Sequence, residues 1–147
     1  MKKEFVMRGQ TASGEQDRLS FSGHKKGYAY KMTEFVIYPS VGVGGTPAEL
    51  AASVTAAKTF SDPENPDFTD QGLIAVTQSL HNNSVNYPVT NLTVINDTYL
   101  VTQNLILAVV DTQNANPVNW QCKFESVKMS GPEEAVTNYR QFLISDD

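Results

Sequence analysis

The residues that could act as catalysts are few and lie far apart in the sequence. Nucleophilic catalysis requires a serine or cysteine beside a base, and the only two histidines are His24 and His81. His24 lies in a basic, glycine-containing segment and His81 in an asparagine-rich one, and no serine stands in a G-x-S-x-G nucleophile elbow. The sequence therefore predicts a protein that is not an enzyme.

One acidic segment has the composition of a possible cation site. Residues 61–70 hold several carboxylates, which are the ligands that calcium prefers, but they lack the glycine and the spacing of an EF-hand. Two prolines also stiffen the segment, so we favour an acidic surface loop and leave calcium binding open. No cofactor is predicted, because the glycine-rich residues 41–45 lack both the P-loop lysine and the dinucleotide fingerprint. The acidic residues are Asp62, Glu64, Asp67 and Asp70.

The net charge of −5 is distributed unevenly along the chain. Residues 1–31 hold seven basic and three acidic residues, a net charge of +4, which leaves −9 for residues 32–147. An acidic body of this kind repels nucleic acid, so we predict no nucleic-acid partner. The charge separation suits packing between copies or against an acidic neighbour, with a solvated tail as the alternative. The expected partner contacts are Lys2, Lys3, Phe5, Met7, Arg8, Arg18, Lys25 and Lys26.

The apolar runs are short. Only three apolar residues separate Glu4 from Arg8, too few for the core of a signal peptide, and no run is long enough to span a membrane. Cys122 is the single cysteine, so an internal disulfide is excluded and a buried, unreactive role is expected. These features predict a cytosolic product without a membrane partner.

Most of the sequence has the composition of β-strands. Short runs rich in Val, Ile, Thr, Tyr and Phe alternate with clusters of Gly, Pro, Asn and Asp, which favours an antiparallel sandwich or barrel. The apolar phase changes between Met32 and Phe35, which predicts a β-bulge near Thr33 and Glu34. The strand candidates are residues 4–8, 18–22, 28–38, 73–80, 91–95, 99–111 and 118–129.

Two further segments carry helix signals. Residues 47–58 follow a good helix start at Thr46, but their apolar residues alternate, so a strand is favoured. At the end of the chain, Ser130 and Glu133 form a capping box that predicts a short helix. We expect its apolar stripe to pack on a sheet. That stripe comprises Ala135, Val136, Tyr139, Phe142 and Leu143.

The order of segments after residue 28 resembles a known group of proteins. Strands of the type Leu73-Ile-Ala-Val76 and Asn91-Leu-Thr-Val94 lead to Val118-Asn-Trp-Gln-Cys-Lys-Phe-Glu125, which precedes the acidic start of the helix. This pattern resembles the small jelly-roll virion structural proteins of marine tailed bacteriophages, although Trp120 replaces their usual tyrosine. The resemblance implies a jelly-roll-like sandwich at residues 28–147, preceded by an extended basic arm at residues 1–27.

The resemblance also implies a function. Such a protein would be made in the host cytoplasm and reside in the virion as a capsid decoration (cement) or minor coat protein. Its partners would be the major capsid protein and further copies of itself. The alternative is a carbohydrate- or receptor-binding β-sandwich module of a phage tail or fibre. That module should display an exposed aromatic platform among Tyr28, Tyr30, Tyr87 and Tyr99.

Overall fold

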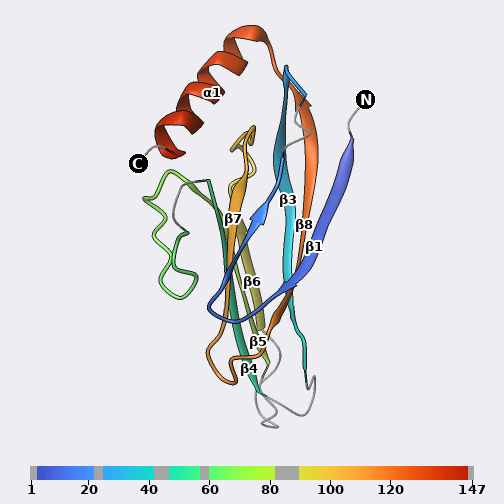
Figure 1. Cartoon of the computed structure of the whole chain (residues 1–147), viewed down its shortest axis with the longest axis vertical. Helices are drawn as coiled ribbons and strands as arrows, with labels where there is room; N and C mark the ends of the chain where they lie inside the picture. The colour runs from blue at the N-terminus through green and yellow to red at the C-terminus, as the bar shows by residue number, and fades with distance from the viewer. Residues whose placement is uncertain (1–2, 22–24, 42–46, 57–59, 82–89, 146–147) are drawn as a thin grey trace.

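The computed structural model describes residues 3–21, 25–41, 47–56, 60–81 and 90–145. These residues form two antiparallel sheets packed face to face, with a helix at one end (Figure 1). One sheet has the strand order β1-β8-β3 and the other the order β2-β7-β4-β5-β6. The elements are β1 (Glu4–Thr11), β2 (Gln16–Leu19), β3 (Tyr28–Pro39), β4 (Ala48–Thr55), β5 (Leu73–His81), β6 (Thr90–Ile95), β7 (Leu105–Asp111), β8 (Val118–Lys128) and α1 (Gly131–Ser145).

The strand pairing follows the doubled-over hairpin of a jelly roll. Strand β1 pairs with β8, β2 with β7, and β4 with β5, so the two halves of the chain run back along each other. The remaining pair, β3 and β6, meets where the two sheets approach: the Thr93 hydroxyl donates a 3.3 Å hydrogen bond to the Phe35 carbonyl. The predicted antiparallel β-sandwich with a short C-terminal helix is thus confirmed, although β6 pairs with β5 in the five-stranded sheet and not with β3.

Strands β3 and β8 show how side-chain alternation directs the chain into this sandwich. Along β8, Trp120, Cys122 and Phe124 are buried. The residues that alternate with them, Asn119, Gln121 and Lys123, are partly exposed. The β3–β8 register shifts between Met32 and Glu34, which confirms the predicted bulge. The bulge lets both phases of β3 face inward, so that Met32 and Phe35 are both buried.

Within the segment over residues 47–58, Ala48–Thr55 form a strand, as the alternation indicated. Strand β4 lies between β5 and β7, and Leu50, Ala52 and Val54 face the core. Burial of this apolar face outweighs the local helix-start signal, because tertiary packing routinely overrides propensity. The strand expected over residues 99–111 is shorter than predicted. Within it, only residues from Leu105 onward join the five-stranded sheet.

The N-terminal region lies inside the sandwich, which corrects the expected boundary at residue 27. All eight residues of β1 pair with β8, and β2 pairs with β7 in the opposite sheet. A tight turn joins them, in which Gly14 takes a φ of 83° that favours glycine. Phe5 stacks on Phe124 with ring centres 5.6 Å apart and contacts Tyr30 and Phe21 edge-on or nearly so. Leu19 and Phe21 therefore belong to the core, and Phe5 and Met7 pack against it rather than lying in a projecting arm.

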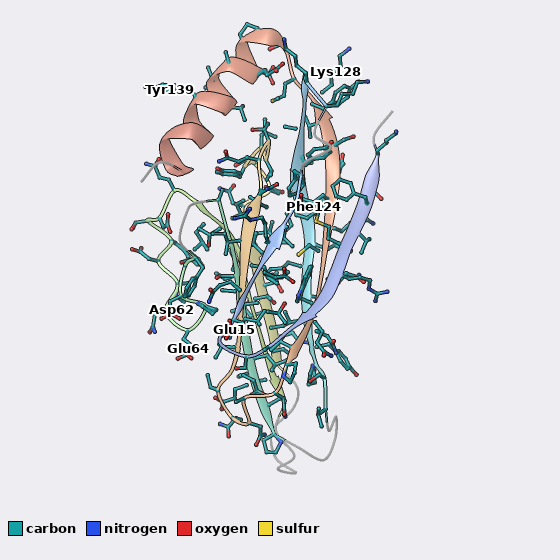
Figure 2. All side chains as sticks on the ribbon, in the orientation of Figure 1. Glu15, Asp62, Glu64, Phe124, Lys128 and Tyr139 are labelled. Carbon is teal, nitrogen blue, oxygen red and sulfur yellow. The ribbon has the colours of Figure 1, made fainter. Side chains whose placement is uncertain are left out.

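Helix α1 begins with the predicted cap but does not bury the residues expected of it. The Glu133 amide donates to the Ser130 hydroxyl, and that hydroxyl also bonds the Glu133 carboxylate. Val136 and Tyr139 are nevertheless exposed, and Figure 2 shows Tyr139 away from the sandwich. The expectation that these residues pack on the sheet is wrong, because the helix lies at one end of the molecule, beyond the end of the five-stranded sheet (Figure 1). The side chains of Phe142 and Leu143 lie outside the described part.

Candidate functional site

The residues expected to contact a partner do not form one surface. Lys2 lies outside the described residues, and Phe5 and Met7 pack against the core from β1. Arg8 is exposed on the three-stranded sheet, whereas Arg18 is exposed on β2 of the other sheet. Lys3 directly precedes β1, whereas Lys25 and Lys26 precede β3. The Lys25 ammonium lies 5.1 Å from the centre of the Tyr28 ring. Phe5 and Met7 are partly buried against the core, because a folded β1 directs both side chains inward, and the partner contacts stay a prediction.

The nucleophile and base candidates are not brought together in the described residues. Cys122 is fully buried between the sheets, and desolvation raises the pKa of its thiol to about 12. His81 ends β5 opposite Ala48, and His24 lies outside the described part. A thiol held protonated in this way is unreactive at neutral pH.

The acidic loop is organised by its own carboxylates. Asp62 accepts the Glu64 amide and Asp67 accepts both the amide and the hydroxyl of Thr69, all within 2.9 Å. A side-chain hydrogen bond from Asn65 lowers the pKa of Asp62, and one from Thr69 lowers the pKa of Asp67. In the described part of the chain, no three acidic, cysteine or histidine side chains converge as metal ligands. These carboxylates thus act as ionised caps of successive turns.

This loop covers part of the outer surface of the five-stranded sheet. The Ser53 hydroxyl donates a 2.6 Å hydrogen bond to the Ser61 carbonyl, and the Ser61 amide donates to the Thr55 hydroxyl at 3.1 Å. Both β4 side chains are fully buried as a result. Figure 1 shows the loop in green on the side of the molecule away from the three-stranded sheet, and Figure 2 places Asp62 and Glu64 on it.

Beside the loop lies an apolar depression that we call the β5–β6 groove, formed by Phe68, Val76, Leu92 and Val94. It consists of two adjoining hollows of about 260 and 170 Å³, which share Phe68, Val76 and Val94. Phe68 is 65% exposed, Leu92 57% and Val94 43%, although all are large apolar side chains. Glu64 and Asp70 line its loop side, whereas strands β5 and β6 carry no acidic or basic side chain apart from His81.

The opposite surface of the molecule is the outer face of the three-stranded sheet, which carries both polar and apolar side chains. On the three-stranded sheet, two rows of outward side chains run across the strands in register, and we call these six residues the amide face. All of them except Gln10 line an open depression of about 530 Å³. One row is Arg8, Gln121 and Val36, and the other is Gln10, Asn119 and Tyr38.

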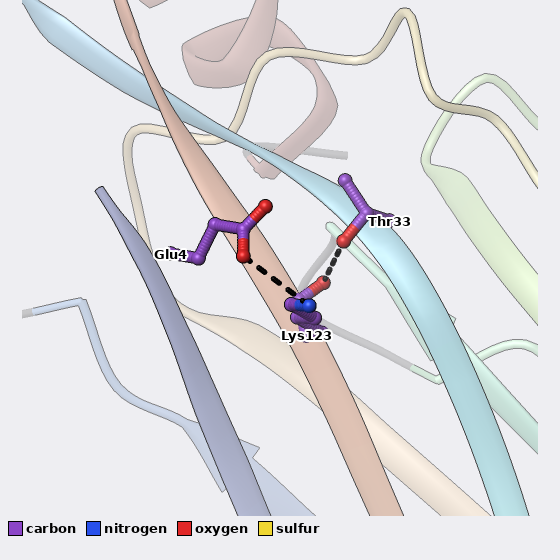
Figure 3. A network of polar contacts seen from close by, with 3 residues as sticks. All are labelled: Glu4, Thr33 and Lys123. Atoms are coloured by element: carbon purple, nitrogen blue, oxygen red, sulfur yellow. Dashed lines mark hydrogen bonds and ion pairs between the residues drawn. The ribbon is translucent and has the colours of Figure 1, made fainter. Parts of the chain in front are cut away.

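Hydrogen bonds hold the strands of this face together. The Gln10 amide donates a 2.9 Å hydrogen bond to the Asn119 side-chain carbonyl, joining β1 to β8. Further along, Lys123 pairs with Glu4 at 3.2 Å, and the Thr33 hydroxyl donates to the Lys123 carbonyl at 3.3 Å (Figure 3). The ion pair itself contributes little free energy because both partners are solvated, but together the contacts link all three strands.

The exposed aromatic residue of this face is not one that the sequence analysis selected. Tyr99 is only 6% exposed and Tyr30 packs against the core, whereas Tyr38 is 57% exposed. Tyr87 lies outside the described residues. The sequence did contain a signal for the exposure of Tyr38. Phe35 and Ile37 point inward, and successive side chains in a strand point to opposite faces, so Val36 and Tyr38 must point outward.

Among the described residues, no helix is long and apolar enough to cross a membrane. No protein-family model matches this chain, and no curated protein matches it in sequence.

Proposed function

We propose that this chain is a virion structural protein that binds and stabilises a capsid lattice, as a decoration (cement) or minor coat protein. The β5–β6 groove carries the proposal, because it joins exposed apolar side chains to an acidic rim formed by Glu64 and Asp70. The partner that fits it is a capsid protein that presents apolar residues flanked by lysine or arginine. The major capsid protein is the partner expected at every position of such a lattice.

The energetics of the groove support this assignment. Burying a phenylalanine or leucine side chain stabilises a complex by about 1.5–3 kcal/mol relative to leaving it in water. Phe68, Leu92 and Val94 adjoin one another and leave much of that free energy unused in the isolated chain. The carboxylates of the rim would attract a basic partner and set its orientation, since charge complementarity acts mainly on association rate and specificity.

The fold is compatible with the proposal without requiring it. Jelly-roll sandwiches occur in viral capsid proteins and in lectin domains, so the strand order is shared between the proposed function and its main alternative. The rigidity of the groove adds support. The loop that forms one wall is tied to β4 through Ser53 and Thr55, so little conformational entropy is lost when a partner binds.

A shell-binding experiment tests the proposal. Shells assembled from the major capsid protein of the encoding virus are mixed with purified chain, and bound copies are counted after gradient sedimentation. Wild type should co-sediment at a fixed stoichiometry and raise the temperature at which the shells disassemble. Phe68→Asp should abolish both effects, while Tyr38→Asp, on the opposite surface with similar exposure, should retain them. Equal binding by both variants would contradict the assigned surface, and no binding by wild type would contradict the function.

A further inference from the structure

We infer that the amide face of the three-stranded sheet is a binding site for a neutral glycan chain. This goes beyond the proposed function, because it concerns the surface opposite the β5–β6 groove. In a lattice-bound protein, that surface would point away from the shell. The inference rests on the chemistry and spacing of the six side chains.

The chemical composition of the face matches a sugar. Gln10, Asn119 and Gln121 carry side-chain amides, each of which both donates and accepts hydrogen bonds. Sugar hydroxyls have the same double character, and one face of a pyranose ring presents apolar C–H groups. Tyr38 supplies an exposed aromatic ring next to the amides, on which such an apolar face can stack.

The dimensions of the amide face also match those of a short stretch of glycan. Neighbouring strands lie about 4.8 Å apart and alternate residues about 6.8 Å apart, so the six residues span roughly 10 by 7 Å. That area corresponds to one or two sugar rings. The depression is open along its length and has a volume of about 530 Å³, so a chain could continue beyond the rings in contact.

Other classes of ligand fit less well. Arg8 is the only cation of the six, and Lys123 beside it is paired with Glu4, so the face lacks the charge for a polyanion. Gln10 and Asn119 already bond each other, but a protein partner would still have to satisfy the Gln121 amide and the Arg8 guanidinium at the centre of the contact. Each of these groups costs free energy if it is buried unpaired. A glycan offers enough hydroxyls to pair with all of them.

The face is also held in one geometry before any ligand binds. The Gln10–Asn119 hydrogen bond fixes two of the amides. Beneath them, a Cβ at Gly9 would lie 2.8 Å from Cζ2 of Trp120, which shows how closely β1 packs on β8. A preorganised platform of this kind loses little entropy on binding.

An NMR titration of the full chain tests the inference. Maltohexaose, cellohexaose and chitohexaose serve as neutral probes, and a heparin hexasaccharide serves as the anionic one. At least one neutral probe should shift backbone amides of residues 8–10, 36–38 and 119–121 in a saturable manner. Tyr38→Ala should weaken that binding at least about fivefold, which corresponds to the loss of one aromatic contact. Tyr38→Phe should restore the affinity.

Two controls keep the result interpretable. Tyr139→Ala removes an aromatic residue of similar exposure from α1 and should leave the affinity unchanged. Thermal melting of each variant shows whether it is folded. The inference is overturned if no neutral probe shifts these amides, if Tyr38→Ala binds as well as wild type, or if only heparin binds. Because the proposed lattice function predicts that shell binding requires Phe68 and not Tyr38, failure here would leave that function standing.

Discussion

The indole nitrogen of Trp120 donates a hydrogen bond of 2.9 Å to the hydroxyl of Thr11, and both residues are buried. This contact joins the central strand β8 to the last residue of the edge strand β1, at the point where the chain turns toward the other sheet. The bond explains how an edge strand with few apolar residues is held in place. It also makes β1 sensitive to small changes in the core.

Replacing Thr11 with valine should destabilise the fold, because the Trp120 N–H would remain buried without an acceptor. The expected loss is about 1–3 kcal/mol in the free energy of unfolding, measured by urea denaturation. Thr11→Ser keeps the hydroxyl and should lose clearly less of the free energy of unfolding than the valine variant does. Equal stability of the valine and wild-type proteins would show that the hydrogen bond contributes nothing.

A side chain at position 9 should be poorly tolerated. A Cβ there would lie 2.8 Å from Cζ2 of Trp120, closer than real contacts allow, and the indole is fixed by its bond to Thr11. Gly9→Ala should therefore cost about 1–3 kcal/mol of stability through overpacking, measured by the same denaturation. Gly131→Ala is the matched control, because no atom lies within 4 Å of its added methyl group and it should leave stability nearly unchanged.

The adjacent residues Phe5 and Val6 test whether β1 belongs to the sandwich. Phe5 packs on Phe124, whereas Val6 faces solvent on the same strand. Phe5→Ala should lower the free energy of unfolding by about 2 kcal/mol, less than for a fully buried phenylalanine, and Val6→Ala should have an effect below about 0.5 kcal/mol. If both substitutions were silent in chemical denaturation, residues 1–27 would be an independent arm after all.

Stability should fall at alkaline pH because of Cys122. Burial raises the pKa of this thiol from 9.0 to about 12, so the folded chain keeps a proton that the unfolded chain releases. The thiol's contribution is therefore fully present below pH 9 and is lost as the pH rises from 9 toward 12. At pH 10 the free energy of unfolding should be lower than at pH 7 by about 1 kcal/mol.

Two measurements check this pH effect. Urea denaturation of wild type and Cys122→Val at pH 7 and pH 10 isolates the thiol, because other groups titrate alike in both proteins. The variant should lack the additional loss. In addition, a thiol reagent at pH 8 should modify Cys122 only as fast as the chain unfolds; rapid labelling of the folded protein would contradict its burial.

Local patterns in the sequence determined the class of fold and several details within it. The alternation of apolar residues identified most strands, the phase change before Phe35 located the bulge, and Ser130 with Glu133 marked the helix start. The same alternation implied that Tyr38 faces outward, because side chains in a strand have a period of two residues. The carboxylates of residues 61–70 were also recognisable as loop residues from their spacing with proline.

The position of these elements in space required the tertiary structure. Basic residues near the N-terminus suggested a projecting arm. In the structure, however, β1 pairs with β8 and Glu4 lies opposite Glu125 in the register. No local pattern in the sequence indicates strand pairing between residues so far apart. The amide face brings together residues 8–10, 36–38 and 119–121, which are far apart in the sequence. The β5–β6 groove places Phe68 of the loop beside Val94 of the edge strand β6. Side-chain alternation is a property of neighbouring residues and can be read from sequence. Which strands become neighbours depends on which faces bury the most apolar surface together. The amide face and the β5–β6 groove are therefore determined only by the tertiary structure.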